Sequence, residues 1–161
     1  MKMPSGIVSK YFRWFVPSAS VLQSLLLLVI RLYWGWEFFL TGKGKLMDLQ
    51  RPTEYFQSLG IPFPHAQAML AGATECLGGL LLLAGLCARL ISIPLTILLT
   101  VAYLTADLDK VKMIFSDPDK FLTADEFLFL FVVVLVFAFG PGRFSIDWLI
   151  QRRAAPASGS A

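Results

Sequence analysis

Two ionisable residues of opposite charge lie within apolar segments of the chain, where hydrocarbon would surround them. Arg31 follows the apolar run of residues 21–30, and Glu75 lies within the apolar segment of residues 66–86. At 1.5 Å per residue, each lies roughly 14–16 Å from the point where its helix would enter the membrane. In a layer about 30 Å thick both would lie near the midplane, where a lone charge costs on the order of 3 kcal/mol. We therefore predict a buried Arg31–Glu75 ion pair, which would either organise an intramembrane site or only fix the packing of the helices.

Small residues next to both charges would let the two helices approach each other. Gly35 lies four residues after Arg31, while Gly78 and Gly79 lie three and four residues after Glu75. These spacings place glycine on or near the helical face that carries the charge. Facing glycines allow close backbone contact between membrane helices, so the predicted ion pair is geometrically feasible.

A second set of charged residues lies toward one predicted side of the membrane. We predict an outer polar mouth formed by Glu37, Lys43, Lys45, Asp107 and Glu126. The alternative is that these residues are solvated helix ends with no shared site.

The segment that contains Arg31 is also rich in aromatic side chains. Tyr33, Trp34, Trp36 and Phe38 all lie within the six residues 33–38. Flat rings can stack on a planar cofactor, so this aromatic wall is a candidate site for a quinone. Packing against lipid is the alternative, because Trp and Tyr are enriched at membrane boundaries. No covalently bound cofactor is indicated.

The sequence offers no support for several other kinds of site. His65 is the single histidine, which excludes bis-histidine haem ligation within one chain, and no metal-ligand cluster is present. Cys76 and Cys87 would lie roughly 16 Å apart on a common helix, too far for a disulfide. The chain has no nucleophile elbow, phosphate-binding loop or dinucleotide-binding glycine motif, so no catalytic residue is assigned.

The elements that would position these residues are membrane helices. Hydrophobic residues make up 57% of the chain and the mean hydropathy is +0.68, whereas soluble domains contain roughly 45–50% apolar residues. This composition predicts an all-α, single membrane domain over residues 1–153, organised as a four-helix transmembrane bundle with short interfacial helices. The predicted segments are spans at about residues 20–44, 66–87, 89–106 and 123–140, an interfacial helix at about 144–153, and a disordered tail at 154–161.

Basic residues set the predicted orientation of the chain. With four spans, the two termini and the turn at Arg89 share one side and hold seven Lys and Arg residues, against six in the other two loops. Acidic residues concentrate on the opposite side. We therefore predict a multi-pass protein of a bacterial inner membrane with both termini in the cytoplasm. The first apolar segment is predicted to be a retained span, because no small-residue cleavage site follows it.

Four segments of the chain resemble the DoxX/DoxD family of small four-span bacterial membrane proteins. They are RLYWGWEFFLTGKGKL at 31–46, YFQSLGIPFP at 55–64, ECLGGLLLLAGLCARL at 75–90 and GPGRFSID at 140–147. The resemblance implies a four-helix membrane bundle with an arginine, a lysine and a glutamate at the positions of Arg31, Lys45 and Glu75. Many members carry a histidine after the third span, whereas this chain has Asp107 in that region.

The resemblance also implies a link to redox metabolism. Some relatives are subunits of a thiosulfate:quinone oxidoreductase, and others are membrane partners of soluble redox enzymes. We therefore expect an oxidoreductase-associated subunit linked to quinone or sulfur metabolism, with membrane lipid, a redox-enzyme subunit or a second copy of the chain as partners. A non-catalytic scaffold that recruits a soluble redox partner is the alternative, followed by a small proton-coupled transporter. Nucleic acid is not an expected partner, because the chain has no basic stripe with interleaved aromatic residues.

Overall fold

The computed structural model describes residues 5–123 and 125–154, with side chains from Ser18 onward except that of Asp125. The described residues form helices and contain no strand, so the all-α prediction is confirmed. In chain order the helices are α1 (Ser5–Met47), α2 (Gln50–Ser58), α3 (Pro64–Ala84), α4 (Ala88–Ala106), α5 (Leu108–Lys112), α6 (Pro118–Leu122), α7 (Asp125–Phe139) and α8 (Ile146–Ala154).

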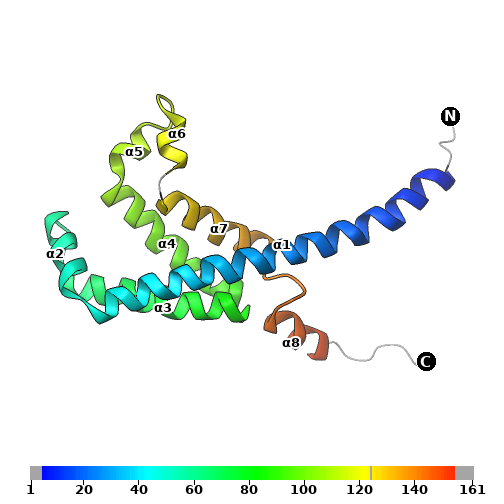
Figure 1. The fold of residues 1–161 in the computed structure, drawn as a ribbon, viewed down its shortest axis with the longest axis horizontal. Helices are drawn as coiled ribbons and strands as arrows, with labels where there is room; N and C mark the ends of the chain where they lie inside the picture. The colour runs from blue at the N-terminus through cyan, green and yellow to red at the C-terminus, as the bar shows by residue number, and fades with distance from the viewer. Residues whose placement is uncertain (1–4, 124, 155–161) are drawn as a thin grey trace.

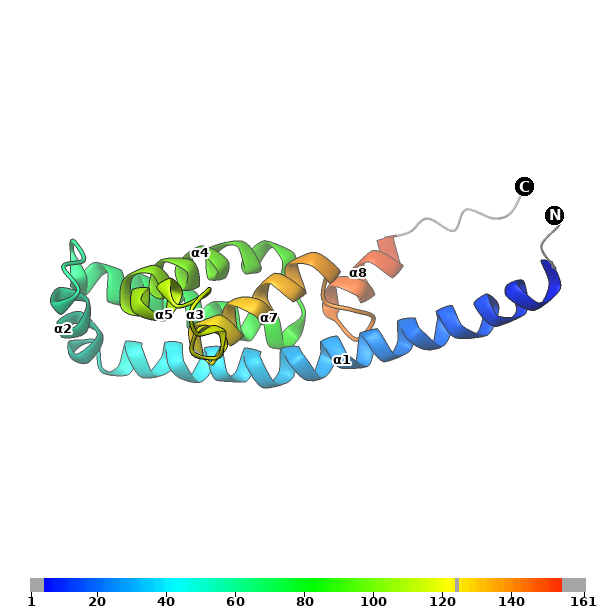
Figure 2. The same cartoon turned by 90° about the horizontal axis from the view of Figure 1, so that it is seen from above.

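Four long helices, α1, α3, α4 and α7, lie side by side as a bundle (Figure 1). Helix α1 packs most extensively against α3, α4 packs against both α3 and α7, and α7 returns to contact α1. The short helices α2, α5 and α6 lie at one end of the bundle. The α3–α4 turn, α8 and the N-terminal half of α1 lie at the other (Figure 2). The chain therefore places two different sets of polar loops at opposite ends of an apolar bundle.

Residues with positive φ end the helices at the α8 end of the bundle. Gly85 ends α3 with φ +63°, and Gly140 follows α7 with φ +76°. Glycine adopts this left-handed conformation without the steric cost of a Cβ atom. Cys87 has φ +49° directly before α4 and is one of two non-glycine residues with positive φ in the described chain. The α3–α4 connection is therefore tight, and the two helices form an antiparallel hairpin.

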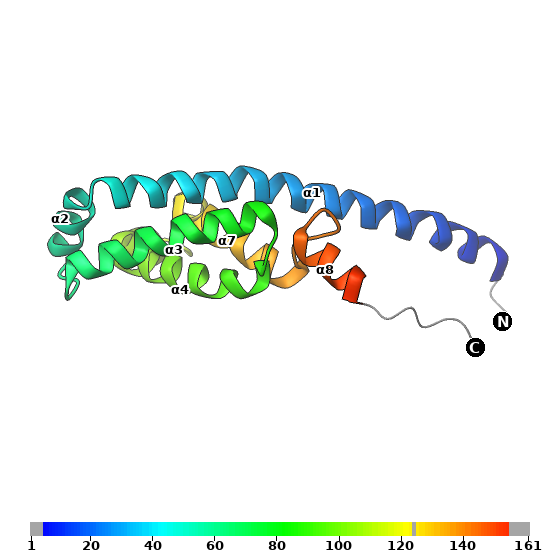
Figure 3. The same cartoon turned by 90° about the horizontal axis from the view of Figure 1, so that it is seen from below.

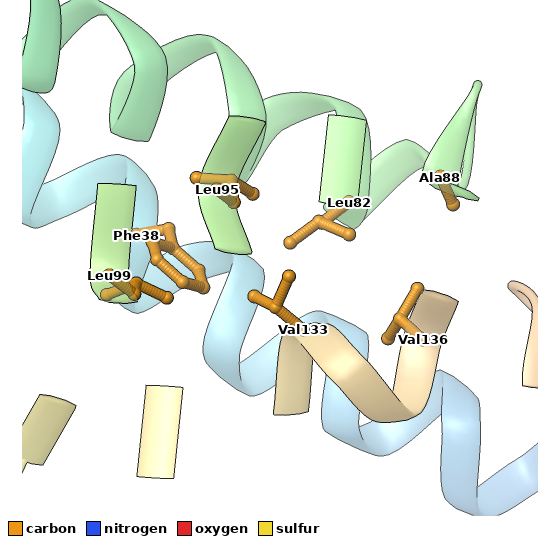
Figure 4. Packing of buried hydrophobic residues seen from close by; sticks show 7 residues of the cluster. All are labelled: Phe38, Leu82, Ala88, Leu95, Leu99, Val133 and Val136. Atoms are coloured by element: carbon orange, nitrogen blue, oxygen red, sulfur yellow. The ribbon is translucent and has the colours of Figure 1, made fainter. Parts of the chain in front are cut away.

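Apolar side chains from all four long helices meet in the centre of the bundle. Phe38, Leu82, Leu95 and Val133 come from α1, α3, α4 and α7, respectively, and each is almost fully buried. Figure 4 shows these side chains pointing toward one another. The core is therefore formed by the four-helix arrangement itself.

The outer surface of the bundle is apolar, as expected for contact with lipid. Leu22, Leu70, Leu90 and Phe131, one from each long helix, are more than half exposed. A water-soluble monomer rarely exposes an apolar surface of this extent. Among the described residues, three helical segments are long and apolar enough to cross a membrane: Ser18–Met47, Pro64–Ala84 and Ala88–Ala106. The chain is a membrane protein, and the fourth crossing, by the shorter α7, stays a prediction.

Hydroxyl groups in α4 are satisfied within the helix itself. Ser92, Thr96 and Thr100 each donate a 2.7 Å hydrogen bond to the carbonyl four residues earlier. An unpaired polar group in hydrocarbon costs several kcal/mol, so this local pairing suits a helix surrounded by lipid.

The helix boundaries differ from the predicted ones mainly in α1. This helix begins at Ser5, before the predicted span at 20–44, and continues to Met47, for 43 residues, whereas its apolar segment Ser18–Met47 agrees with the predicted span. Its N-terminal half passes beyond the other bundle helices (Figure 1). The predicted interfacial segment at 144–153 corresponds to α8. The predicted tail lies outside the described residues, apart from Ala154.

Candidate functional site

Glycines determine how α1 and α3 lie against each other. A Cβ atom at Gly79 would lie 2.5 Å from Phe39 N and 2.6 Å from Gly35 O, which leaves no room for a side chain. A Cβ atom at Gly42 would likewise collide with the backbone of Cys76. The two helices are antiparallel, and these contacts let them pack closely along their length (Figure 3). The predicted role of Gly35 and Gly79 in close helix approach is confirmed.

Gly78, which was predicted to face α1, lies against α4 instead. A Cβ atom at Gly78 would lie 2.9 Å from Leu95 Cδ1. Adjacent positions on a helix point about 100° apart, so Gly78 and Gly79 serve two different neighbouring helices.

Glu75 is buried in the α1–α3 contact and forms an ion pair with Lys45. The Lys45 Nζ and Glu75 Oε1 atoms are 2.5 Å apart, and their side chains are 33% and 6% exposed. The second carboxylate oxygen, Oε2, is buried without a hydrogen-bond partner among the described residues. The pair therefore places a partly accessible cation and a buried carboxylate, with one unused acceptor oxygen, inside an apolar helix contact.

Arg31 is buried at a different place, where α1 passes the end of α3. Its residue exposure is 1%, and its Nη2 atom donates a 2.5 Å hydrogen bond to the carbonyl of Phe144. A side chain at Gly85 would overlap the guanidinium, so glycine is required there both for φ and for space. Asp147 attracts Arg31 electrostatically. The Nε and Nη1 atoms of Arg31 have no hydrogen-bond partner in the described part of the chain.

The predicted Arg31–Glu75 ion pair is wrong. Arg31 lies level with Gly85, about ten residues, or roughly 15 Å of helix axis, from Glu75. The prediction set residue 20 of α1 level with the end of α3, whereas Arg31 is the residue that lies level with that end. Arg31 therefore meets the loop before α8, while Glu75 meets Lys45.

Two of the predicted outer polar residues, Asp107 and Glu126, come together where α4 ends and α7 begins. The Asp107 carboxylate accepts a hydrogen bond from the Glu126 carboxyl group and forms a 2.9 Å ion pair with Lys110. The hydrogen bond from Glu126, followed by the interactions with Lys110, holds the pKa of Asp107 below its ordinary value, against the opposing effect of burial.

The other three predicted outer residues do not join this group. Lys45 pairs with Glu75, whereas neither Glu37 nor Lys43 takes part in a salt bridge among the residues described. Lys43 is exposed and Glu37 is half-buried. The structure thus divides the predicted mouth into an α1–α3 ion pair and an α4–α7 carboxyl pair.

The predicted aromatic wall is also divided, because its four residues leave α1 in different directions. Trp34 and Phe38 point inward, with ring centroids 4.8 Å and 4.7 Å from that of Phe129 in α7. Tyr33 and Trp36 are exposed on the outer surface of α1. Phe38 belongs to the core, so the prediction of one continuous wall is wrong.

The structure also identifies Asp147 as an organising residue that the sequence analysis did not single out. Its two carboxylate oxygens accept hydrogen bonds from the backbone N–H groups of Cys87 and Ala88, at 2.8 Å and 3.0 Å. Its own N–H donates to Gly85 O at 3.0 Å. Asp147 therefore caps the N-terminus of α4 from α8. The motif GPGRFSID contained this residue, but a cap from a distant segment has no local sequence signature.

Comparison with protein families agrees with the membrane architecture. The DoxX family model matches residues 26–108, just over half of the chain. The chain belongs to the DoxX family. The DoxX region begins within α1 and ends at the start of α5, so it includes Arg31, Lys45 and Glu75, whereas α7, α8 and GPGRFSID lie outside it. No curated protein and no solved structure is matched.

Proposed function

We propose that this DoxX-family protein is a membrane subunit of a redox system that transfers electrons between sulfur compounds, with thiosulfate as the candidate, and membrane quinone. The observation that supports this proposal most directly is the buried Lys45–Glu75 pair. Ionisable residues within membrane helices are costly and commonly mark a functional path. A quinone takes up protons when it is reduced. Glu75, with one oxygen still available, can hold a proton within reach of the partly exposed Lys45.

The outer face of α1 offers a surface that suits a quinone ring. Tyr33 and Trp36 are about half exposed toward the lipid, and Glu37 lies four residues after Tyr33 on the same helical face. The two rings would contact the quinone head, and the half-buried Glu37 carboxyl group would exchange protons beside it. Trp34 and Phe38 are already packed against Phe129 and would support this surface from behind.

A non-catalytic scaffold is the second candidate, and a specific feature favours it. The two buried charges each have a partner within the chain, since Glu75 pairs with Lys45 and Arg31 binds the Phe144 carbonyl. Buried ion pairs can serve only to fix the packing of helices. On this view the bundle is a platform for a soluble redox enzyme, and the charges have no chemical role.

Quinone content separates the two candidates. The protein is purified in mild detergent, its lipids are extracted, and quinone is measured by absorbance. For the redox subunit we expect near-stoichiometric quinone in the wild type, loss of most of it in Glu37→Gln, which changes the carboxyl group beside the two rings, and no change in Glu54→Gln. Glu54 is a matched control because it is an exposed carboxylate on α2.

The electron source is tested in membrane vesicles. Thiosulfate-dependent quinone reduction should require this chain and should fall in Glu75→Gln at unchanged protein level. A folded protein that lacks quinone and retains a soluble enzyme during purification would instead support the scaffold. Thiosulfate-dependent quinone reduction that is as fast in Glu75→Gln as in the wild type would remove the role proposed for Glu75.

A further inference from the structure

Two adjoining cavities lie at the end of the bundle where α1, the α3–α4 turn and α8 meet. The first has a volume of about 650 Å³ and is bordered by both polar and apolar groups. The second, of about 440 Å³, is lined almost entirely by apolar atoms. Ser24, Arg143, Ser145 and Trp148 border both cavities, so the two adjoin, and we treat them together as one amphipathic site. Both volumes fall within the range of ligand pockets.

The polar cavity carries an excess of positive charge. Arg89 and Arg143 line it, and in the described chain neither takes part in a salt bridge. Asp147 also lines it, but both of its carboxylate oxygens already accept backbone N–H groups of the α4 N-terminus. The buried Arg31 lies close behind, near enough to Asp147 for electrostatic attraction. The cavity is therefore suited to an anionic group.

The apolar cavity lies beside these arginines on the lipid-facing side of α1. Val21 of α1 and Phe144, Trp148 and Leu149 of the α8 region line it. Val21, Phe144 and Leu149 are exposed, so the cavity opens toward the surroundings of the bundle. An apolar chain that lies in the membrane can enter it without crossing a polar barrier.

The walls of this amphipathic site are held in place by hydrogen bonds. Ser145 Oγ donates to Gly142 O at 2.7 Å and accepts from Trp148 N at 3.2 Å. Arg31 binds the Phe144 carbonyl, and Asp147 joins α8 to the α3–α4 turn. A site with walls fixed in this way loses little conformational freedom when a ligand binds.

We propose that this site binds one anionic phospholipid, with its phosphate between Arg89 and Arg143 and one acyl chain in the apolar cavity. Helices α3 and α7 end and α4 begins at this level, so lipid headgroups would lie beside it. Basic pockets between membrane helices are suited to anionic headgroups. The adjoining apolar cavity favours a lipid over a free anion, because a free anion would leave it unfilled. The lipid would join α8 to the bundle independently of any redox activity.

The reactivity of Cys87 tests this proposal directly, because its exposed thiol lines the polar cavity. The full-length protein carrying Cys76→Ala is placed in phosphatidylcholine nanodiscs, with or without phosphatidylglycerol of the same acyl chains. Cys87 is then labelled with N-ethylmaleimide, an uncharged reagent. With the anionic lipid at roughly ten times its dissociation constant, we expect labelling to slow by about tenfold.

Two kinds of variant separate the headgroup from the acyl chain. Arg89→Gln combined with Arg143→Gln should abolish the protection, whereas Arg153→Gln should retain it. Arg153 is exposed on α8, carries the same charge and does not line either cavity. Val21→Trp, which fills the apolar cavity without changing the charge, should also abolish protection. Gel filtration confirms that each variant remains folded.

The labelling rates of Cys87 decide whether the site binds an anionic phospholipid. Protection by phosphatidylglycerol that is lost in the double arginine variant and in Val21→Trp, but kept in Arg153→Gln, supports it. Equal labelling with and without phosphatidylglycerol overturns it, as does protection that persists in the double arginine variant. Equal protection by inorganic phosphate in phosphatidylcholine nanodiscs would assign the site to a free anion and overturn the lipid assignment.

Discussion

Among individual residues, Lys45 and Glu75 make the interaction that is most sensitive to substitution. Removing one partner of a buried ion pair leaves an uncompensated charge, and Glu75 is almost fully buried. We expect Glu75→Lys or Lys45→Glu to lower the free energy of unfolding by about 2–4 kcal/mol, toward the low end of the buried-pair range because Lys45 is one third exposed. The combined exchange should recover most of that loss, measured by unfolding in mixed detergent micelles.

Lys43→Glu provides the control for this pair. Lys43 is exposed, two residues before Lys45, and forms no salt bridge in the described chain. Its reversal should change stability by less than about 0.5 kcal/mol. A double exchange of Lys45 and Glu75 that is as unstable as the single variants would show that the two charges are not coupled.

The sequence indicated which charges are buried but not which of them are paired. Arg31 and Glu75 were both predicted to be buried inside the bundle, and both are. Their pairing was predicted from depths counted from assumed membrane entry points, and an error of about ten residues in α1 separates the two by roughly 15 Å. Apolar periodicity does not reveal where along a long helix a neighbouring helix begins to pack. Glycines were predicted at the α1–α3 contact, but the residues that they meet across it, such as Cys76 opposite Gly42, are visible only in the structure.

At the level of helices, the close contact of α1 and α3 depends on glycines that have no room for a side chain. A Cβ atom at Gly79 would lie 2.5 Å from Phe39 N, whereas one at Gly44 would meet nothing within 4 Å. We expect Gly79→Ala to destabilise the bundle by about 1–3 kcal/mol through overpacking. Gly44→Ala should be neutral or stabilising, by up to about 1 kcal/mol, because alanine favours the helix more than glycine does. Thermal unfolding of both variants in detergent measures the difference.

Asp147 connects two helices by capping α4 from α8. In Asp147→Ala the N–H groups of Cys87 and Ala88 lose their acceptors, and Arg31 loses its nearby negative charge. We expect a loss of about 1–2 kcal/mol, the usual value of a helix cap. The freed loop should also be cleaved faster by trypsin at Arg143. Asp109→Ala, an exposed change in α5, should leave the cleavage rate unchanged, and equal rates in all three proteins would argue against this link.

Helix positions were easier to predict from the sequence than the contacts between helices. The spans corresponding to α3, α4 and α7 were predicted within a few residues, because glycines and polar loops bound them. The apolar segment Ser18–Met47 of α1 also agrees with the predicted span at 20–44, although the helix itself begins about 15 residues earlier, at Ser5. The cap from Asp147 joins residues 60 positions apart. Such long-range contacts require the tertiary fold.

At the level of the whole molecule, the two ends of the bundle differ in chemistry. The end with the α3–α4 turn and α8 carries Arg89, Arg143, Arg152 and Arg153, while residues 107–126 at the other end hold six acidic and three basic residues (Figure 1). The described chain begins with α1 and ends with α8, and both of these ends lie on the same side of the bundle core (Figure 2). If α7 spans the membrane together with α1, α3 and α4, the chain crosses it four times, and this even number agrees with both ends lying on one side.

The membrane orientation is testable with single cysteines at the two ends. In a Cys76→Ala and Cys87→Ala background, we expect Phe115→Cys to react with a membrane-impermeant maleimide in intact spheroplasts. Arg153→Cys should react only after the membrane is permeabilised. Phe115 is 96% exposed between α5 and α6, and Arg153 is exposed in α8. Neither thiol would be buried in the protein, so only the membrane can keep the reagent from it.

The labelling pattern also reports whether α7 crosses the membrane. It is 15 residues long, or about 22 Å, which is shorter than a typical hydrocarbon layer of about 30 Å. It nevertheless packs along α4, which is long and apolar enough to span, and runs from the α5–α6 end to the α8 end. If α7 crosses, residues 115 and 153 must label from opposite sides. Labelling of both from outside would mean that α7 does not cross, and the reverse of the expected pattern would invert the predicted orientation of the whole bundle.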